Sequence, residues 1–358
     1  TLNVQENVFY RCASGVVGSY GLFLNNFIID FSNAGFYIPL QGGSGQFYNN
    51  ILSGRQGEST DGIDLARGIF RNNIIRGCDA AAYPWSLQPL QLVSNAIDSC
   101  GTIFDLSNSG SVSGNINYNN FYGNGIISND ISKLDPDTLI YTTFDPMYEG
   151  TDSSNYRLQM YSPLIDAGDP TILDVDGTRS DIGRYGGPYG QRYEYLDLAP
   201  KLPRFSTVTK KPTGVDLQWH GGTEADFNSF SLHRGREAGF IPDETNRIYT
   251  GVDTLFSDSL ADPTGSYTYK LKAKDNQGNA SKLDSVTVVM TGLAGETAPT
   301  PDRIFLYQNY PNPFPKGSLW DNPSTKIKFS LDSEAEVILR VYDVNGREVA
   351  VLQRGMLP

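Results

Sequence analysis

The chain has 358 residues, a formal net charge of −12, three cysteines and two histidines. Its length predicts more than one domain. The 37 glycines, 21 tyrosines and 18 phenylalanines, with only 19% charged residues, are typical of a β-rich extracellular protein. The negative charge argues against nucleic acid and anionic membrane surfaces as partners. No apolar run approaches the ~20 residues of a membrane span.

Six asparagines, each followed by an apolar residue, recur along the first third of the chain at spacings of 19, 24, 23, 22 and 25 residues. They are Asn7, Asn26, Asn50, Asn73, Asn95 and Asn120. A period of this size indicates a solenoid, in which each repeat buries its apolar face against its neighbours. Asparagine tolerates the left-handed backbone of a tight turn, and stacked amide side chains can hydrogen-bond to one another. We therefore predict a parallel β-helix with one column of asparagines.

One coil divides into short strands at residues 62–65, 68–71 and 74–78. Cys12, Cys78 and Cys100 each lie five residues after a repeated asparagine, so they share one position in their coils. We expect stacked, buried thiols that pack as small hydrophobic groups. A Cys78–Cys100 disulfide is the alternative. A metal site would need further ligands, and residues 1–192 contain no histidine.

Residues 162–170 (SPLIDAGDP) and 174–187 (DVDGTRSDIGRYGG) follow the repeats. Together they resemble the closing segment of secreted right-handed parallel β-helix proteins of the pectin-lyase-like fold. The resemblance implies such a helix over residues 1–192, and we expect its N-terminus to be missing because the chain opens inside a repeat. The glycine- and aspartate-rich turns are predicted to cap the open end of the solenoid.

Residues 200–292 alternate between strand patterns and turn signals. They include VDLQW at 215–219, FSLHR at 230–234 and YTYKLKA at 267–273. This segment resembles a fibronectin type III domain, an immunoglobulin-like β-sandwich, with Trp219 as its core tryptophan and Leu260 and Tyr267 at its tyrosine corner. His220 and His233 lie on predicted strands of this sandwich, and we assign them no chemistry.

The last segment contains LYQNYPNPF at 306–314, NPSTKI at 322–327 and VYDVNGREV at 341–349. These motifs, in this order, resemble the C-terminal sorting domain of the type IX secretion system, a small β-sandwich, over residues 304–358. Residues 315–321 are inserted between motifs that normally adjoin, and we expect the last strands of the domain to be absent. The resemblance implies a protein that is secreted or held on the outer surface of a Gram-negative bacterium.

Asp64 and Asp105 are predicted to share one outward position two coils apart, a separation of about 9.6 Å. Inverting glycosidases place their carboxyls ~6.5–9.5 Å apart, so this pair is the catalytic candidate, and two solvated aspartates are the alternative. Tyr83 and Trp85 lie on or beside the intervening strand and could stack on sugar rings. The predicted substrate-binding residues are thus Asp61, Asp64, Tyr83, Trp85 and Asp105.

Residues 60–64 (TDGID) are similar to a short motif of polygalacturonases. That family also needs paired aspartates, a histidine and an Arg/Lys motif, and only Asp79 follows here, so we reject this activity. Polysaccharide lyases of the same fold use Ca²⁺-bridged carboxylates with an Arg or Lys base. Four arginines are present without a pattern that places them around a metal: Arg55, Arg67, Arg71 and Arg76.

Asp174, Asp176 and Asp181 form part of a calcium-loop pattern, in which Asp-x-Asp-Gly offers two close carboxylates and a turn glycine. Ca²⁺ is therefore the only cofactor that the sequence suggests. The alternative is that these aspartates accept hydrogen bonds from turn amides.

Three functions agree with these patterns. The first is a secreted or cell-surface protein whose β-helix binds an extracellular polysaccharide, with the type III segment as a spacer and the last segment as the signal for the type IX secretion machinery. The second is a polysaccharide lyase or glycoside hydrolase whose catalytic coils lie upstream of Thr1. The third is a surface adhesin without catalytic activity.

Overall fold

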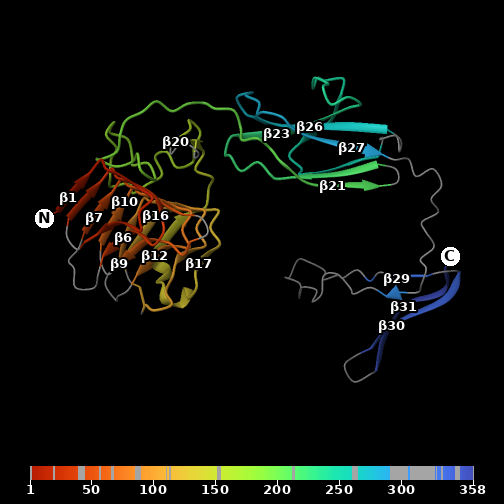
Figure 1. Ribbon diagram of the computed structural model, residues 1–358, viewed down its shortest axis with the longest axis horizontal. Helices are drawn as coiled ribbons and strands as arrows, with labels where there is room; N and C mark the ends of the chain where they lie inside the picture. The colour runs from red at the N-terminus through yellow and green to blue at the C-terminus, as the bar shows by residue number, and fades with distance from the viewer. Residues whose placement is uncertain are drawn as a thin grey trace. The chain divides into compact units, whose positions relative to one another are not determined.

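The first part of the chain folds into a parallel β-helix of about five turns (Figure 1). The computed structural model describes residues 2–18, 21–38, 45–55, 58–65, 68–84, 90–109, 111–112, 114–150, 155–211, 214–259, 265–290, 305–306, 327, 329–331, 334–342 and 347–357. The chain divides into two units, Thr1–Leu260 with Ser266–Val289, and Ala261–Gly265 with Met290–Pro358. The β-helix and the sheets that follow it belong to the first unit.

Each coil contributes one strand to each of three rows. The first row contains β1 (Leu2–Gln5), β4 (Gly21–Leu24), β7 (Gly45–Tyr48), β10 (Gly68–Arg71), β13 (Leu90–Val93) and the start of β16 (Gly114–Tyr122). The second contains β2 (Val8–Tyr10), β5 (Phe27–Phe31), β8 (Ile51–Gly54), β11 (Ile74–Arg76), β14 (Ala96–Asp98) and the end of β16. The third contains β3 (Ser14–Val17), β6 (Ala34–Ile38), β9 (Asp61–Leu65), β12 (Ala80–Pro84), β15 (Thr102–Phe104) and β17 (Ile126–Ser128).

Identical positions stack because neighbouring strands are parallel and in register. Phe23, Phe47 and Phe70 are register partners, and their rings lie parallel at centroid distances of 4.7 and 4.4 Å. Cys78 and Cys100 are buried in the same core, and all three cysteines are free thiols. The hypothesis of packed thiols is therefore confirmed for this pair, and the disulfide is not formed. Cys12 is only partly buried at the edge of the core.

The asparagine column exists, but its last member is Asn119 and not Asn120. From Asn7 to Asn95, each asparagine donates its backbone and side-chain N–H groups to the Oδ1 of the next one along the column. Asn95 donates to Asn119 at 2.9 and 3.1 Å. Asn120 is instead bonded to Thr142 and Phe144 in the following turn.

The left-handed residue of each turn is the one before the column, which also differs from our prediction. Its φ lies between 54° and 58° in every coil, at Glu6, Asn25, Asn49, Asn72, Ser94 and Tyr118. In the last coil Tyr118 takes this conformation, and the column residue is therefore Asn119. Stacking in register on the preceding coil, and not the backbone preference of tyrosine, therefore decides which residue takes the left-handed conformation.

The closing segment does not cap the end of the solenoid, as the sequence suggested, but runs back along its side. Residues 166–190, which we call the lateral segment, are held by the side chains of the left-handed turn residues. Ser94 accepts from the N–H of Asp169 at 2.9 Å, and Asn72 donates to the carbonyl of Asp181 at 2.8 Å. Asn49 and Asn25 continue the series with bonds to the carbonyls of Gly186 and Tyr189 at 2.7 and 3.3 Å.

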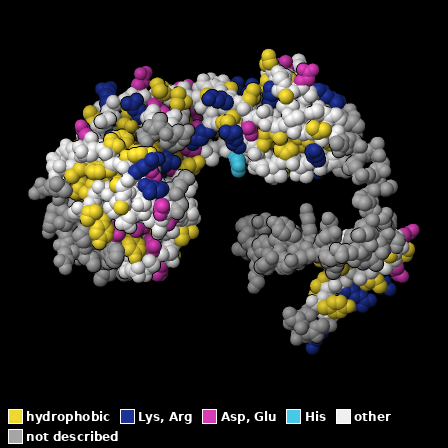
Figure 2. Space-filling model, viewed as in Figure 1, with side chains coloured by type: hydrophobic (Ala, Val, Ile, Leu, Met, Phe, Trp, Pro, Cys, Tyr) yellow, Lys and Arg dark blue, Asp and Glu magenta, His cyan; other side chains and the backbone are white. Residues whose placement is uncertain are grey.

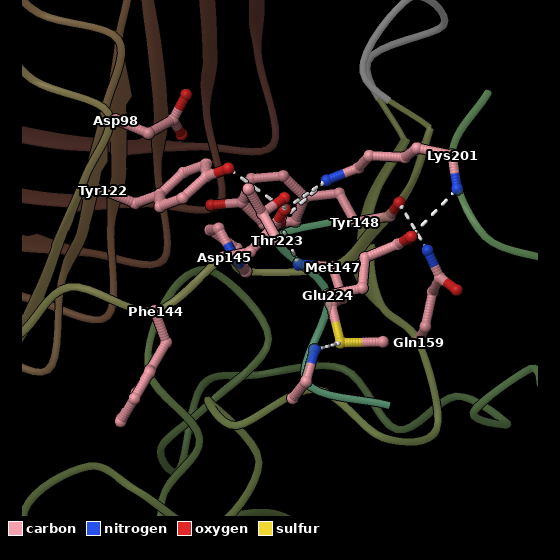
Figure 3. Close-up of polar contacts among 12 residues, drawn as sticks. Asp98, Tyr122, Phe144, Asp145, Met147, Tyr148, Gln159, Lys201, Thr223 and Glu224 are labelled. Atoms are coloured by element: carbon pink, nitrogen blue, oxygen red, sulfur yellow. Dashed lines mark hydrogen bonds and ion pairs between the residues drawn. The ribbon is translucent and has the colours of Figure 1, made fainter. Parts of the chain in front are cut away.

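Short elements lie between the solenoid and the lateral segment. They are η1 (Ile131–Lys133), η2 (Pro136–Thr138), β18 (Leu139–Thr142), which pairs with β16, and the antiparallel strands β19 (Tyr148–Gly150) and β20 (Asn155–Leu158). The buried Asp145, in this stretch, accepts hydrogen bonds from Lys201, Tyr122, Thr223 and the N–H of Met147 (Figure 3). Asp145 therefore ties the end of the solenoid to the residues that follow the lateral segment.

Two antiparallel sheets form the rest of the first unit. One contains β21 (Phe205–Lys211), β22 (Gly214–Trp219) and β25 (Leu255–Asp258), and the other contains β24 (Arg247–Gly251), β23 (Phe227–Gly235), β26 (Gly265–Asp275) and β27 (Asp284–Met290). Trp219 of the first sheet packs on Phe230 and Tyr249 of the second, both at 5.9 Å between ring centroids. Tyr267 is buried, whereas Leu260 lies outside the described residues. His233 is buried and bonded to Asn246, which agrees with a structural role.

The second unit contains two strand pairs in its described residues. β28 (Phe305–Leu306) pairs with β29 (Phe329–Ser330), and β30 (Ala335–Tyr342) pairs with β31 (Glu348–Leu357), all antiparallel. Most of the first two sorting motifs, residues 307–326, lies outside the described residues. Among the described residues, no helix combines the length and the apolarity that crossing a membrane requires.

Candidate functional site

An open cleft of about 430 Å³ lies where the lateral segment passes the side of the solenoid. Its walls come from two consecutive turns of the solenoid and from two stretches of the lateral segment. The lining residues are Tyr48, Asn49, Arg71, Asn72, Thr171, Ile172, Leu173, Pro188 and Tyr189. A volume of this size lies within the range of pockets that bind small molecules.

Two stacked tyrosines form one wall of the cleft. Tyr48 ends strand β7, and Tyr189 comes from the lateral segment, with ring centroids 5.4 Å apart and an interplanar angle of 14°. Tyr189 remains 45% exposed, so part of its surface is open to a ligand. Burial is the main reason that the pKa of Tyr48 is raised, and the positive charge of Arg71 opposes the shift. The Tyr48 hydroxyl is therefore protonated at neutral pH and can donate a hydrogen bond.

Arg71 supplies the positive charge of the cleft. It is the register partner of Tyr48 in the adjacent coil, which places the guanidinium beside the tyrosine pair. Its Nε is buried and has no hydrogen-bond partner. The guanidinium as a whole lines the cleft and offers further N–H donors to an acceptor oxygen of a ligand.

Two glycines allow the lateral segment to pass close to the turns of the solenoid. Gly186 and Gly187 pass over Asn72, and a Cβ on Gly187 would stand 2.7 Å from Asn72 Oδ1. Gly187 also has φ of +74°, which side chains rarely tolerate. The carbonyls of Arg184 and Gly186 accept from Asn49 Nδ2 at 2.5 and 2.7 Å. The cleft wall is therefore held by the side chains of the turns beneath it.

The predicted aspartates lie on the third row of strands. Asp64 is the register partner of Tyr83, which follows Ala82, and Asp105 directly follows Phe104, the register partner of Ala82. Asp64, Tyr83 and Asp105 therefore occupy one column, with the two carboxylates two coils apart, as predicted. Asp64 is only 8% exposed, so the alternative of two solvated aspartates is wrong for this residue. Trp85 lies outside the described residues.

Asp61 is the most perturbed carboxyl of this row. Burial, followed by the charges of Asp64, Asp105 and Asp79, raises its pKa to about 7. A carboxyl that titrates near neutral pH among other carboxylates can donate or accept a proton in catalysis. We call Asp61, Asp64, Asp79 and Asp105 the acidic row. Three of them are predicted site residues, and Asp79 is not.

Asp105 and Tyr83 are already bonded within the protein. Asp105 accepts hydrogen bonds from the N–H of Ser107 at 2.9 Å and from Asn129 Nδ2 at 2.6 Å. Burial alone would raise the pKa of Asp105, but these bonds outweigh it and lower the pKa. The hydroxyl of Tyr83 accepts from Asn108 Nδ2. Asp105 therefore fits the role of an ionised turn residue better than that of a general acid.

The three aspartates of the partial calcium loop serve the turns of the lateral segment. Asp174 accepts from the N–H groups of Asp181 and Gly187, Asp176 accepts from Thr178, and Asp181 accepts from Tyr195 and from the N–H of Asp166. Burial and the charge of Asp181 raise the pKa of Asp174 to about 7. Among the described residues, only Asp197, Asp226 and Asp275 bring three possible ligand atoms within 4.8 Å of one another.

The cleft contains functional candidates that the sequence did not suggest. Tyr48 and Arg71 each lie two residues before a column asparagine, so alignment of the coils could have placed them side by side. Tyr189 carries no such signal, because its position depends on the course of the lateral segment. Figure 2 shows hydrophobic patches interspersed with charged side chains on the surface of the solenoid.

No protein-family model matches this chain, and no curated protein matches it either.

Proposed function

We propose that this chain is a secreted or cell-surface protein whose β-helix binds an extracellular polysaccharide in the cleft between Tyr48, Arg71 and Tyr189. The tyrosine pair carries the proposal, since a flat aromatic surface with an exposed edge suits the C–H-rich face of a sugar ring. The guanidinium of Arg71, which lines the cleft, can donate to a sugar hydroxyl or to a uronate carboxylate. The cleft is open, as binding to a long polymer requires.

The test is binding of the chain to a panel of neutral and uronate-containing polysaccharides. We expect Tyr189→Ala to weaken binding about tenfold, because loss of an aromatic anchor commonly costs ~1.4 kcal/mol or more. Arg71→Gln should weaken binding to uronates more than binding to neutral polymers. Tyr161→Ala removes another exposed tyrosine and serves as the control.

Equal binding by Tyr189→Ala and the unaltered protein would rule out the cleft as the site. Absence of binding across the whole panel would rule out the carbohydrate function and leave the adhesin, whose partner would be a protein. A pectin-lyase-like, right-handed helix remains part of this proposal, supported by the resemblance of residues 162–187.

A second candidate is a lyase or glycoside hydrolase, which the raised pKa of Asp61 in the acidic row favours. Its test is degradation of the same polysaccharides, with and without Ca²⁺, by the unaltered chain and by the Asp61→Asn and Asp64→Asn variants. Loss of activity in both variants would establish a catalytic row. Unchanged activity in both would place catalysis elsewhere in this chain.

We also propose that residues 200–292 form a fibronectin type III spacer and that residues 304–358 direct export through the type IX system. The two packed antiparallel sheets and the buried Trp219 and Tyr267 support the first part. The three motifs and the antiparallel pair β30 and β31 support the second. In the producing cell, deletion of residues 304–358 should keep the protein inside the outer membrane, and export without them would contradict the proposal.

A further inference from the structure

Three aspartates from separate segments of the chain lie close together at one end of the second antiparallel sheet, which contains β23 and β26. Asp197 lies in the stretch between the lateral segment and β21, Asp226 directly precedes β23, and Asp275 is the last residue of β26. Each offers a carboxylate oxygen, and these oxygens lie within 4.8 Å of one another. Asp226 and Asp275 are buried, and Asp197 is exposed.

Asp275 has a buried carboxylate oxygen that a bound ligand could satisfy. Its Oδ1 accepts hydrogen bonds from the N–H groups of Gly278 and Asn279, both at 2.7 Å. Its Oδ2 is buried and has no hydrogen-bond partner, while the whole residue is only 2% exposed. A buried carboxylate oxygen without a donor is unfavourable, particularly beside two further carboxylates.

Among the residues that the structure describes, no side-chain cation neutralises this group. None of the ion pairs formed between described residues includes Asp197, Asp226 or Asp275. Three carboxylates whose oxygens lie within 4.8 Å of one another repel each other when they are ionised. A bound cation would both remove this repulsion and satisfy the oxygen of Asp275.

We propose that Asp197, Asp226 and Asp275 bind one Ca²⁺ ion. All three ligands are oxygens, which hard cations prefer, whereas Zn²⁺ favours nitrogen and sulfur. Ca²⁺ takes its ligands at ~2.3–2.6 Å, so two of its ligands stand at most roughly 5.2 Å apart, and oxygens within 4.8 Å of one another can bind the same ion. Mg²⁺ demands near-ideal octahedral geometry and gives up its waters reluctantly, so a cluster of three protein carboxylates suits Ca²⁺ better.

The ion would join the linker to the sandwich. Asp197 belongs to the chain that leaves the lateral segment, and Asn279 Nδ2 donates to its Oδ1 at 3.0 Å. Four residues later, the N–H of Lys201 donates to Glu224 Oε2 at 2.9 Å. Ca²⁺ would therefore add a third attachment of this linker to the sheets. This role is independent of polysaccharide binding in the cleft.

The experiment is calorimetric titration of the chelator-treated, full chain with Ca²⁺, combined with thermal unfolding. We expect one ion bound and an unfolding midpoint that rises with Ca²⁺ concentration, because the ion binds the folded state. Asp197→Ala and Asp275→Asn should each weaken Ca²⁺ binding at least about tenfold, since loss of even an outer-shell partner has an effect of this size. Mg²⁺ should raise the midpoint less.

Two controls locate the site. Asp253→Asn removes an exposed carboxylate elsewhere on the sheets, and Asp176→Asn alters the partial calcium loop. Both should keep the affinity of the unaltered protein. Absence of Ca²⁺ binding at millimolar concentration, or affinity that survives Asp197→Ala and Asp275→Asn, would overturn the proposal. Loss of binding in Asp176→Asn alone would assign the ion to the lateral segment. Because Asp197 is exposed, its variant should fold and remain informative.

Discussion

Lys201 places its ammonium 2.6 and 2.8 Å from the two carboxylate oxygens of Asp145 (Figure 3). Asp145 follows the last strand of the solenoid, and Lys201 precedes the first strand of the antiparallel sheets. The side chain of Asp145 is 2% exposed and that of Lys201 is 54% exposed. Burial opposes ionisation of Asp145, but the charge of Lys201, its hydrogen bond and the bonds from Thr223 and Met147 outweigh burial and lower the pKa.

Lys201→Met should destabilise the protein by about 1–2 kcal/mol, between the values for exposed and buried ion pairs, because the lysine is half exposed. Urea unfolding at pH 7 measures this. The lowered pKa means that the stabilisation by Asp145 is present above its unfolded pKa of about 3.9 and is lost as the pH falls through the folded value. Lys211→Met, which breaks a solvent-exposed pair with Asp216, should lower the free energy of unfolding much less than Lys201→Met does. Equal effects of the two variants would contradict the structural role of Lys201.

Asn73→Ala should cost about 3–5 kcal/mol, because it removes the side chain that satisfies the buried carbonyl of Phe47 and the N–H of Asn50. Asn7→Ala, in the same column but exposed, should cost below ~1 kcal/mol. The free energy of unfolding from urea titration distinguishes them. Similar losses would show that the column contributes through the backbone turn and not through buried hydrogen bonds.

Asp61→Asn should reduce the loss of stability on going from pH 4 to pH 7. In the folded protein the pKa of Asp61 is about 7, against about 3.9 unfolded, so the folded state holds more protons in this range. The free energy of unfolding therefore falls as the pH rises through this window. Asp174, whose pKa is also about 7, contributes in the same direction.

Urea midpoints at several pH values between 4 and 7.5 test the role of Asp61. The Asp61→Asn profile should be flatter than that of the unaltered protein, and the Asp61→Asn/Asp174→Asn profile flatter still. Asp253→Asn removes an exposed carboxylate outside the acidic row and is the control. An unchanged slope in Asp61→Asn would show that this carboxyl ionises normally.

Cys12 should react with iodoacetamide in the native protein well before Cys78 and Cys100. Cys12 is partly exposed, whereas the other two are 3% exposed in the solenoid core. A hydrogen bond between the thiols, followed by burial, raises the pKa of Cys78 and suppresses its thiolate. Mass spectrometry of the timed reaction measures the order. In denaturant all three should react, and failure of Cys78 and Cys100 to do so would indicate a disulfide.

The period of the asparagines was sufficient to predict the β-helix, because every coil must bury its apolar positions against the same positions of its neighbours. It also placed Asp64 and Asp105 two coils apart at one shared position, since in-register parallel strands convert constant spacing into a column, whereas the pairing of Tyr83 with Asp64 was not predicted. At Asn119 and Asn120 local sequence could not choose between two adjacent asparagines. Stacking on Asn95 selected the first, even though Tyr118 then had to adopt a left-handed backbone.

The course of the lateral segment was decided only in three dimensions. Its hydrogen bonds join residues 75 to 164 positions apart, and no local preference reveals which turn each carbonyl or N–H will meet. The tyrosine cleft and the meeting of Asp197 with Asp226 and Asp275 depend on the same kind of long-range contact. The repeats thus made the β-helix predictable from the sequence. Both candidate ligand sites depend instead on non-repeating segments that return to the β-helix or continue beyond it.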